Sequence, residues 1–266
     1  MIERLGKLFA EDGRAVIVPI DHTLSGRVME GWERPAETLS QIIDGGADAI
    51  MTTYGILKQF RHLLAGRVPT ILRLDGGMTS FREQWNEYTA WRLLYQVEDA
   101  LRIGADGVIV MAFFGAECEL DSIEIVSKVA ADCERWSVPL AVEALPCPGA
   151  WDGDVYNAEA VASASRLGAE YGADFIKTYY PGSVEGFRRV TTTCPVPVLI
   201  AGGPKMPTDR DVLETVQGML QAGGAGVFFG RNVWQHQNPT AMTRALCEVI
   251  HDGVSVSEAL KNLRSA

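Results

Sequence analysis

Eight short apolar runs recur along the chain, and each is followed by a turn and then by a stretch in which apolar residues repeat at helical spacing. Most of these runs are continuous rather than alternating, which is typical of parallel strands that are buried on both faces. Eight such β/α units predict a (β/α)8 TIM barrel, with a doubly wound open sheet as the alternative. The expected strands are residues 15–21, 47–53, 70–75, 107–114, 139–145, 174–179, 197–202 and 226–230.

Amphipathic stretches between these runs predict the helices. Residues 90–103 place Leu93, Leu94, Val97 and Leu101 on one helical face, and a glycine follows as a stop. No linker rich in proline, glycine or serine interrupts the pattern, so we expect one domain over residues 1–266. The other long helices are expected at residues 158–171, 211–222 and 240–250.

Composition narrows the classes of function. The net charge of −10 is spread along the chain and no Lys/Arg-rich stripe is present, which argues against a nucleic-acid partner. No apolar run approaches the roughly 18–20 residues of a membrane span, and the first residues do not read as a signal peptide. The five cysteines form no CxxC pair and are typical of reduced thiols. We therefore expect a cytoplasmic protein with no membrane partner.

A barrel predicts where its active site lies, because catalytic side chains in this fold come from the C-terminal ends of the strands. The residues at those ends form a short set of candidates. They are Asp21, His22, Thr53, Tyr54, Asp75, Phe113, Phe114, Glu143, Leu145, Lys177, Tyr179, Gly202, Gly203, Gly230, Arg231 and Asn232.

Lys177 stands out among the six lysines, because the other five fall in expected helices or loops while Lys177 lies within the sixth strand. Burial there disfavours the ammonium form and would lower the pKa of the amine. A neutral amine attacks a ketone and forms an iminium that acts as an electron sink. The alternative is a lysine that extends to solvent or pairs with a carboxylate.

The seventh and eighth strands end in glycines, and barrels often bind phosphate with the loops after these two strands. Gly202 and Gly203 follow the seventh strand, with Lys205 close behind, and Gly230 and Arg231 follow the eighth. Glycines let backbone N–H groups approach an anion, and an arginine adds a charged fork. The pattern indicates a phosphate site, with tight turns as the alternative explanation of the glycines.

These residues belong to segments through which the chain resembles the DhnA-type class I aldolases. That family includes archaeal-type fructose-bisphosphate aldolases, 2-amino-3,7-dideoxy-D-threo-hept-6-ulosonate synthases and the LsrF-type autoinducer-2 thiolases. The resemblance implies a Schiff base on Lys177, a polar catalytic role for Asp21, a phosphate cradle of the glycines with Arg231, and a homo-oligomer often built from pentameric rings. The matching segments are residues 17–22, 172–179, 194–197, 200–205 and 230–235.

The chain departs from the aldolase and synthase members near the end of the fifth strand. Leu145 stands where those members carry a tyrosine that acts as acid and base, and leucine cannot move a proton. Strand alternation puts Glu143 on the same inward face, where it would take the role if burial raised its pKa towards neutrality. Tyr179 is the second candidate, because it shares a face with Lys177. The alternative for Glu143 is a salt bridge across the barrel mouth.

Two further residues have open roles. Asp75 departs from the small or neutral residues of the family, and it would either bind a substrate hydroxyl or pair with Arg73. His22 would bind a substrate hydroxyl or cap its loop. Only four histidines are present, two of them in expected helices, so we expect no metal and no cofactor beyond the lysine itself.

The sequence thus predicts a class I aldolase that acts on a phosphorylated ketose, with dihydroxyacetone phosphate as one product. An acyl-transferring thiolase that uses coenzyme A is the first alternative, since such an enzyme needs no tyrosine at position 145. A barrel that binds a sugar phosphate without catalysis is the second.

Overall fold

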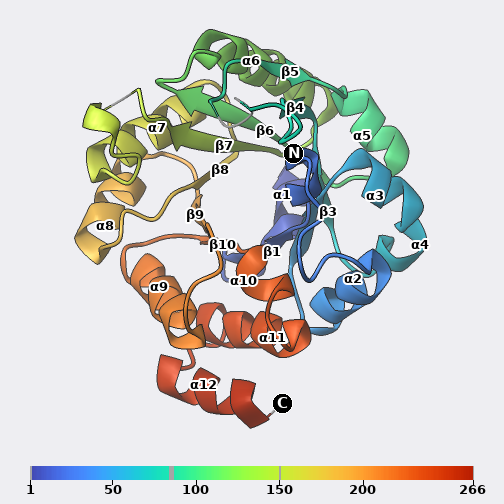
Figure 1. The fold of residues 1–266 in the computed structure, drawn as a ribbon, viewed down its shortest axis with the longest axis vertical. Coiled ribbons are helices and arrows are strands. Elements are labelled where there is room, and N and C mark those ends of the chain that lie inside the picture. The colour runs from blue at the N-terminus through green and yellow to red at the C-terminus, as the bar shows by residue number, and fades with distance from the viewer. Residues whose placement is uncertain (1, 84–86, 150, 266) are drawn as a thin grey trace.

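The computed structural model describes residues 2–83, 87–149 and 151–265, and eight parallel strands form a closed barrel at its centre (Figure 1). Around the barrel the strands follow the order β1-β10-β9-β8-β7-β6-β3-β2. The TIM barrel is therefore confirmed, and the closed ring excludes a doubly wound open sheet. The barrel strands are β1 (Ala15–Pro19), β2 (Ala49–Thr52), β3 (Thr70–Arg73), β6 (Gly107–Phe114), β7 (Leu140–Pro146), β8 (Phe175–Thr178), β9 (Val198–Ala201) and β10 (Gly226–Phe228).

Helices surround the barrel, and α12 (Val256–Ser265) packs outside the ring against α9 and α11 (Figure 1). Among the described residues, none of the helices has the length and apolar character that a bilayer-spanning segment needs. The other helices are α1 (Ile2–Leu8), α2 (Pro35–Asp44), α3 (Tyr54–Gln59), α4 (Arg61–Leu64), α5 (Val97–Ile103), α6 (Glu119–Trp136), α7 (Ala158–Glu170), α8 (Val184–Thr193), α9 (Asp209–Gln221), α10 (Arg231–Trp234) and α11 (Pro239–Ile250), with short 3-10 helices η1 (His22–Ser25) and η2 (Trp151–Gly153).

An antiparallel hairpin departs from the repeating pattern between β3 and α5. Its strands β4 (Asp75–Gly77) and β5 (Trp91–Leu93) pair with Asp75 opposite Leu93. The helix expected at residues 90–103 is therefore wrong in its first half, since α5 begins only at Val97. The N–H groups of residues 94 and 95 both donate to the Leu74 carbonyl, at 2.8 and 3.0 Å, and these non-local bonds hold the segment extended.

Apolar side chains fill the N-terminal half of the barrel interior. Ile17, Ile71, Phe175 and Phe228 are buried there, and α1 covers this end of the barrel with Leu8 fully buried (Figure 1). The Phe9 ring packs edge-on against Phe175 at 5.3 Å between centroids. This apolar layer closes the bottom of the barrel, and the C-terminal ends of the strands lie at the opposite end.

Aspartates tie neighbouring strands together at the same end. Each of three aspartates precedes a strand, accepts a hydrogen bond from a backbone N–H near the start of the adjacent strand at 2.6–3.1 Å, and returns one from its own N–H to the same residue. Between β9 and β10 only the second bond exists, from Ala225 N–H to the Val198 carbonyl at 2.8 Å. The three paired residues are Asp48 with Val16, Asp106 with Thr70, and Asp174 with Leu140.

Candidate active site

A pocket of about 320 Å³ opens at the C-terminal end of the barrel strands. Its charged lining residues come from segments far apart in the sequence, which the closed barrel brings to one mouth. They are Asp21, His22, Arg73, Asp75, Glu143, Lys177 and Arg231.

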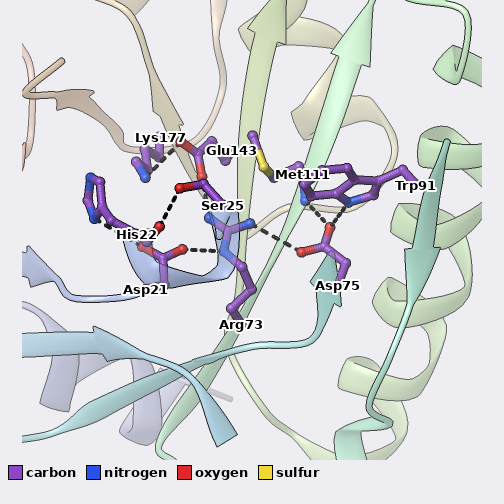
Figure 2. Close-up of polar contacts among 9 residues, drawn as sticks. All are labelled: Asp21, His22, Ser25, Arg73, Asp75, Trp91, Met111, Glu143 and Lys177. Carbon is purple, nitrogen blue, oxygen red and sulfur yellow. Dashed lines mark hydrogen bonds and ion pairs between the residues drawn. The ribbon is translucent and has the colours of Figure 1, made fainter. Parts of the chain in front are cut away.

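Lys177 lies in β8 with its side chain only 7% exposed. Glu143 is its register neighbour in β7, and the Lys177 Nζ lies 2.7 Å from Glu143 Oε1. The ammonium also lies 5.4 Å from the centroid of the Phe228 ring. Lys177 therefore does not extend to solvent: it pairs with a carboxylate inside the pocket (Figure 2).

Arg73 lies at the centre of the charged cluster and contacts three carboxylates (Figure 2). Its Nε donates to Asp21 Oδ2 at 2.6 Å, one terminal nitrogen donates to Asp75 Oδ1 at 3.1 Å, and the other contacts Glu143 Oε2. Burial alone would lower the pKa of Arg73, but the three carboxylates raise it above its usual value. Arg73 is thus a fixed cation that orients the carboxylates around it.

Sequence reasoning considered Arg73 only as a partner for Asp75 and missed its central position. A signal was present, because Arg73 is the one charged residue in the apolar run from Thr70 to Leu74. A charged side chain inside a strand that is buried on both faces must have partners in the interior.

Glu143 is held as a carboxylate. Burial alone would raise its pKa, but contacts with Lys177 and Arg73 hold the pKa of Glu143 below its usual value. The rise towards neutrality on which the acid/base role depends is therefore not found while Lys177 is charged. Glu143 is placed to accept a proton from Lys177, and loss of the Lys177 charge removes the largest of the contacts that lower its pKa. The pKa of Asp21 is likewise lowered, since Arg73, His22 and Lys177 outweigh its burial.

Asp75 is fully occupied by protein groups. It accepts from Arg73, from the Trp91 indole at 2.8 Å and from the Met111 N–H at 2.6 Å, and its side chain is 0% exposed (Figure 2). Burial raises the pKa of Asp75 against these contacts. Of the two roles expected for Asp75, the geometry favours pairing with Arg73 over binding a substrate hydroxyl.

His22 begins η1, directly after β1 and Asp21. Its Nδ1 lies 3.5 Å from Asp21 Oδ1, and its ring packs edge-on against Trp234 at 5.4 Å. Burial lowers the pKa of His22 although Asp21 opposes the shift, and this favours the neutral form of the ring. Gly230 leaves room for this ring, since a Cβ there would lie 2.8 Å from His22 Cε1. A neutral imidazole at the pocket wall can hydrogen-bond a substrate oxygen.

Arg231 follows β10 and lines the pocket beside His22. Its Nε is buried and has no hydrogen-bond partner within the described residues. Asn232 fixes the loop after β9 against this segment, since its side chain donates to the Gly202 carbonyl at 2.9 Å and accepts from Met206 N–H at 2.7 Å. Asn232 belongs to the candidate set, but sequence analysis gave it no role. The structure shows it as a residue that positions the loop after β9.

The remaining residues of the expected phosphate cradle lie outside the pocket lining. Gly203 adopts a φ of +60° in the loop after β9, and Gly230 caps α10. Lys205 points elsewhere: it is exposed and its Nζ donates to the Gln235 carbonyl at 2.5 Å. The structure therefore brings Arg231 to Lys177 in one pocket, and it does not bring Lys205 there.

Tyr179 lies beyond the end of β8, so the strand alternation used to place it with Lys177 does not apply. It does not line the pocket, and burial raises the pKa of its phenol. Tyr88, which sequence analysis did not single out, does line the pocket and stacks on Phe113 at 4.6 Å. Leu145 packs beneath these aromatic rings in a buried apolar cluster.

No group of three or more histidine, cysteine, aspartate or glutamate side chains within the described residues is arranged to hold a metal ion. The polar interior of the mouth is instead organised around Arg73 and Lys177. A buried lysine paired with a carboxylate in an open pocket is equipped for covalent chemistry on a carbonyl group.

A TIM barrel with a lysine and a carboxylate paired at its mouth is compatible with an aldolase type of barrel enzyme, and the comparisons with known proteins show such a family. The family model described as DeoC/LacD family aldolase matches residues 15–236. The chain therefore belongs to the DeoC/LacD aldolase family, and the resemblance drawn from its sequence motifs is confirmed.

Among its relatives, the chain is 37% identical over 258 residues to 2-amino-3,7-dideoxy-D-threo-hept-6-ulosonate synthase of Halobacterium salinarum, covering 97% of this chain and 94% of the relative. It is 33% identical over 260 residues to the 3-hydroxy-5-phosphonooxypentane-2,4-dione thiolase of Klebsiella pneumoniae, covering 97% and 84%. An archaeal fructose-1,6-bisphosphate aldolase whose catalytic lysine is covalently bound to the carbinolamine intermediate superposes with a TM-score of 0.83 at 30% identity, covering 93% and 98%.

Proposed function

We propose that this protein is a class I aldolase that cleaves or forms a C–C bond of a phosphorylated ketose through a Schiff base on Lys177, with dihydroxyacetone phosphate as one product. The observation that carries the proposal is the 2.7 Å pair between Lys177 Nζ and Glu143 Oε1 in a pocket that Arg231 also lines. The covalent lysine of the similar archaeal aldolase supports it.

The first steps need a proton carrier beside the amine. Glu143 takes a proton from the Lys177 ammonium, and the neutral amine adds to the ketone carbon to give a carbinolamine. The Glu143 carboxylic acid then protonates the carbinolamine hydroxyl, which leaves as water, and an iminium remains. Arg73 holds the other oxygen of Glu143 throughout, so the carboxylate stays aimed at the nitrogen.

Glu143 is a carboxylate again when the C–C bond breaks. It accepts the proton of the C4 hydroxyl while the electrons of the C3–C4 bond move into the iminium, giving an enamine and a free aldehyde. The Glu143 acid returns its proton to the enamine carbon, and water then hydrolyses the iminium. Asp21 is less suited to this role because it is Glu143, and not Asp21, whose carboxylate lies 2.7 Å from Lys177 Nζ, and Tyr179 is less suited because it lies outside the pocket lining.

The phosphate of the substrate would bind at the β10 side of the mouth. Among the residues that the structure describes, none bonds to the buried Nε of Arg231 there, and His22 lines the same pocket. Gly202, Gly203 and Gly230 belong to the adjoining strand ends and loops. The Gly202 N–H already donates to the Phe228 carbonyl at 3.1 Å, so the backbone N–H groups of Gly203 and Gly230 are the ones proposed to approach the anion. The printed names of the relatives include a phosphonooxy compound and a bisphosphate, which supports a phosphorylated substrate.

Borohydride trapping tests the proposal directly. Incubation with dihydroxyacetone phosphate and sodium borohydride should add the mass of the reduced ketose phosphate to the peptide that contains Lys177. K177A should lose the adduct, whereas K128A, which removes an exposed lysine paired with Glu124, should keep it. Absence of the adduct, or its appearance on another lysine, would overturn the proposal.

A second candidate function is a coenzyme A-dependent thiolase acting on a phosphorylated dione. Leu145 favours it, because the tyrosine expected of an aldolase is absent, and so does the similarity to the Klebsiella thiolase. Turnover that requires coenzyme A and yields an acyl-coenzyme A would establish this function in place of the aldolase.

A barrel that binds a sugar phosphate without catalysis would instead retain its full ligand response in K177A.

The expected cytoplasmic location and the homo-oligomer, in pentameric or decameric form, stay predictions.

A further inference from the structure

The strand order of the barrel separates the two ends of the proposed substrate. Around the ring, β8 with Lys177 lies two strands from β10 and two strands from β6. Arg231 follows β10 and Met111 lies in β6, so these residues stand on opposite sides of the mouth. A phosphate bound at Arg231 therefore leaves the β6 side for the fragment beyond the reacting bond.

Met111 lies at the level of the catalytic groups. Met111 in β6 is in register with Glu143 in β7, and Glu143 is in register with Lys177 in β8. Adjacent strands are about 4.8 Å apart, so the backbone of Met111 is roughly 10 Å from that of Lys177. The enamine on Lys177 bonds to the carbonyl carbon of an aldehyde. A side group on that aldehyde can span this distance and contact the Met111 side chain.

The lining on the β6 side is apolar, and we call it the apolar wall: Met78, Tyr88, Trp91 and Met111. The Phe113 ring supports two of its members, with Tyr88 stacked at 4.6 Å and Trp91 edge-on at 4.7 Å. Figure 2 shows Trp91 and Met111 on one side of Arg73, and His22 and Lys177 on the other.

Apart from the Tyr88 hydroxyl, the polar side-chain groups near the apolar wall are engaged by other protein groups. The Trp91 indole N–H donates to Asp75, and both oxygens of Asp75 accept from protein groups. Arg73 is compensated by three carboxylates and is not available to bind a second phosphate. Within the described lining, Lys177 and Arg231 are the other Lys/Arg cations, and neither lies on this side. The wall is therefore matched to an uncharged, apolar group.

We propose that the aldehyde partner of this enzyme carries an apolar or aromatic group and no phosphate. This inference rests on the proposed Schiff-base function. In the direction of synthesis, Glu143 takes a proton from C3 of the iminium and the resulting enamine carbon bonds to the aldehyde carbon. The aldehyde oxygen receives the proton from Glu143 and becomes a hydroxyl, and water releases the product from Lys177.

A homologous series of aldehydes tests the inference. With dihydroxyacetone phosphate as donor, kcat/KM should rise from ethanal to pentanal by about fourfold for each methylene that the wall buries. Glyceraldehyde 3-phosphate should be a poorer acceptor than pentanal, since its phosphate would lose water without gaining a cation.

Two variants of Met111 separate apolar contact from shape. M111L keeps the volume and apolar character and should retain the rise with chain length. M111Q has nearly the same length but a polar end, and it should flatten the rise. The readout is the change in log kcat/KM for each added methylene, measured within each variant. A general loss of activity lowers all values together and does not change this slope. An equal slope in M111L and M111Q would remove Met111 from the proposal.

The outcomes distinguish this inference from the function on which it rests. If the borohydride adduct forms on Lys177 but glyceraldehyde 3-phosphate is the better acceptor, or no aldehyde of the series condenses, the apolar partner is wrong and the Schiff base stands. If no adduct forms on Lys177, both proposals fall.

Discussion

The same strands supply an apolar layer at one end of the barrel and a charged layer at the other. In β8, Phe175 lies in the apolar layer and Lys177 in the charged one; in β3 the corresponding pair is Ile71 and Arg73. Two residues along a strand cover about 6.6 Å and return to the same face. One such step therefore separates side chains that stabilise the fold from side chains proposed to carry out the reaction. A change in either layer should leave the function of the other measurable.

The largest effect is expected in the charged layer. E143Q keeps the shape of the side chain but removes the proton acceptor, and it should slow formation of the Lys177 adduct with dihydroxyacetone phosphate by about 10²–10⁴-fold. The measurement is the rate of borohydride-trapped adduct. E134Q, at an exposed position of α6, should react at the rate of the unmodified protein. An unchanged rate in E143Q would assign proton transfer to another group.

The next effect concerns the cation that holds this layer together. R73M leaves Asp21, Asp75 and Glu143 without their shared partner, and it should lower the free energy of unfolding by about 5 kcal/mol. The loss should shrink as the pH falls, because the uncompensated carboxylates then bind protons. Urea unfolding at several pH values measures both effects.

The control for R73M is R92M, which removes an exposed arginine paired with Asp121. Surface pairs of this kind contribute about 0–1 kcal/mol. A similar cost in the two variants would mean that the central position of Arg73 has no special weight.

The apolar layer should respond in stability rather than in chemistry. F175A removes a fully buried ring that contacts Phe9 and Phe228, and we expect it to cost about 3–5 kcal/mol. Adduct formation on Lys177, measured below the melting temperature, should change little. F81A removes a ring that is 88% exposed and should leave the unfolding curve in place. A selective loss of adduct in F175A would show that the two layers are coupled.

The smallest effect comes from a charge at the apolar end. His251 contacts Asp12 and Asp48 at 3.0 Å each, and these hydrogen bonds, chiefly that to Asp48, raise its pKa to about 9 although partial burial opposes the shift. The unfolded pKa is about 6.5, so the stabilisation is complete below that pH and is lost as the pH rises through the folded value.

Because the His251 site is partly open to solvent, we expect a loss of about 1–2 kcal/mol between pH 6.5 and pH 9.5. Thermal melts across this range measure it. H251Q should remove this component of the pH dependence. If H251Q melts with the same pH dependence as the unmodified protein, the ion pairs make no net contribution.

Sequence patterns predicted the barrel and the position of Lys177 because both depend on local periodicity. The apolar runs mark the strands, and a lysine within one of them is visible in the sequence alone. The hairpin could not be predicted in this way, since residues 91–95 are held extended by pairing with β4 and by bonds to Leu74 and Asp75, which lie about 20 residues earlier in the chain. The same local pattern of leucines fits a helix, and the long-range contacts decide against it.

The residues of the candidate site also differ in whether local sequence or long-range contacts determine their place. Asp21, Glu143, Lys177 and Arg231 could be placed at the mouth because each lies within two residues of the C-terminal end of an expected strand. The role of Arg73 depends on three carboxylates from different strands, and Tyr88 reaches the pocket only through the hairpin. Lys205 sits in a matching family segment, yet its long side chain turns towards Gln235.

The aspartates at the base of the barrel divide its circumference into quarters. The same backbone hydrogen bond occurs once in each of four strand pairs, β1–β2, β3–β6, β7–β8 and β9–β10. Its donor is the N–H of an aspartate in three pairs and of Ala225 in the fourth. The fold thus carries a fourfold repeat in its hydrogen bonds, and the amino-acid sequence shows it as Gly-Ala-Asp at residues 46–48, 104–106 and 172–174 and Gly-Gly-Ala at residues 223–225. A repeat of this kind is what a barrel assembled from copies of one two-stranded unit would retain after its side chains had diverged.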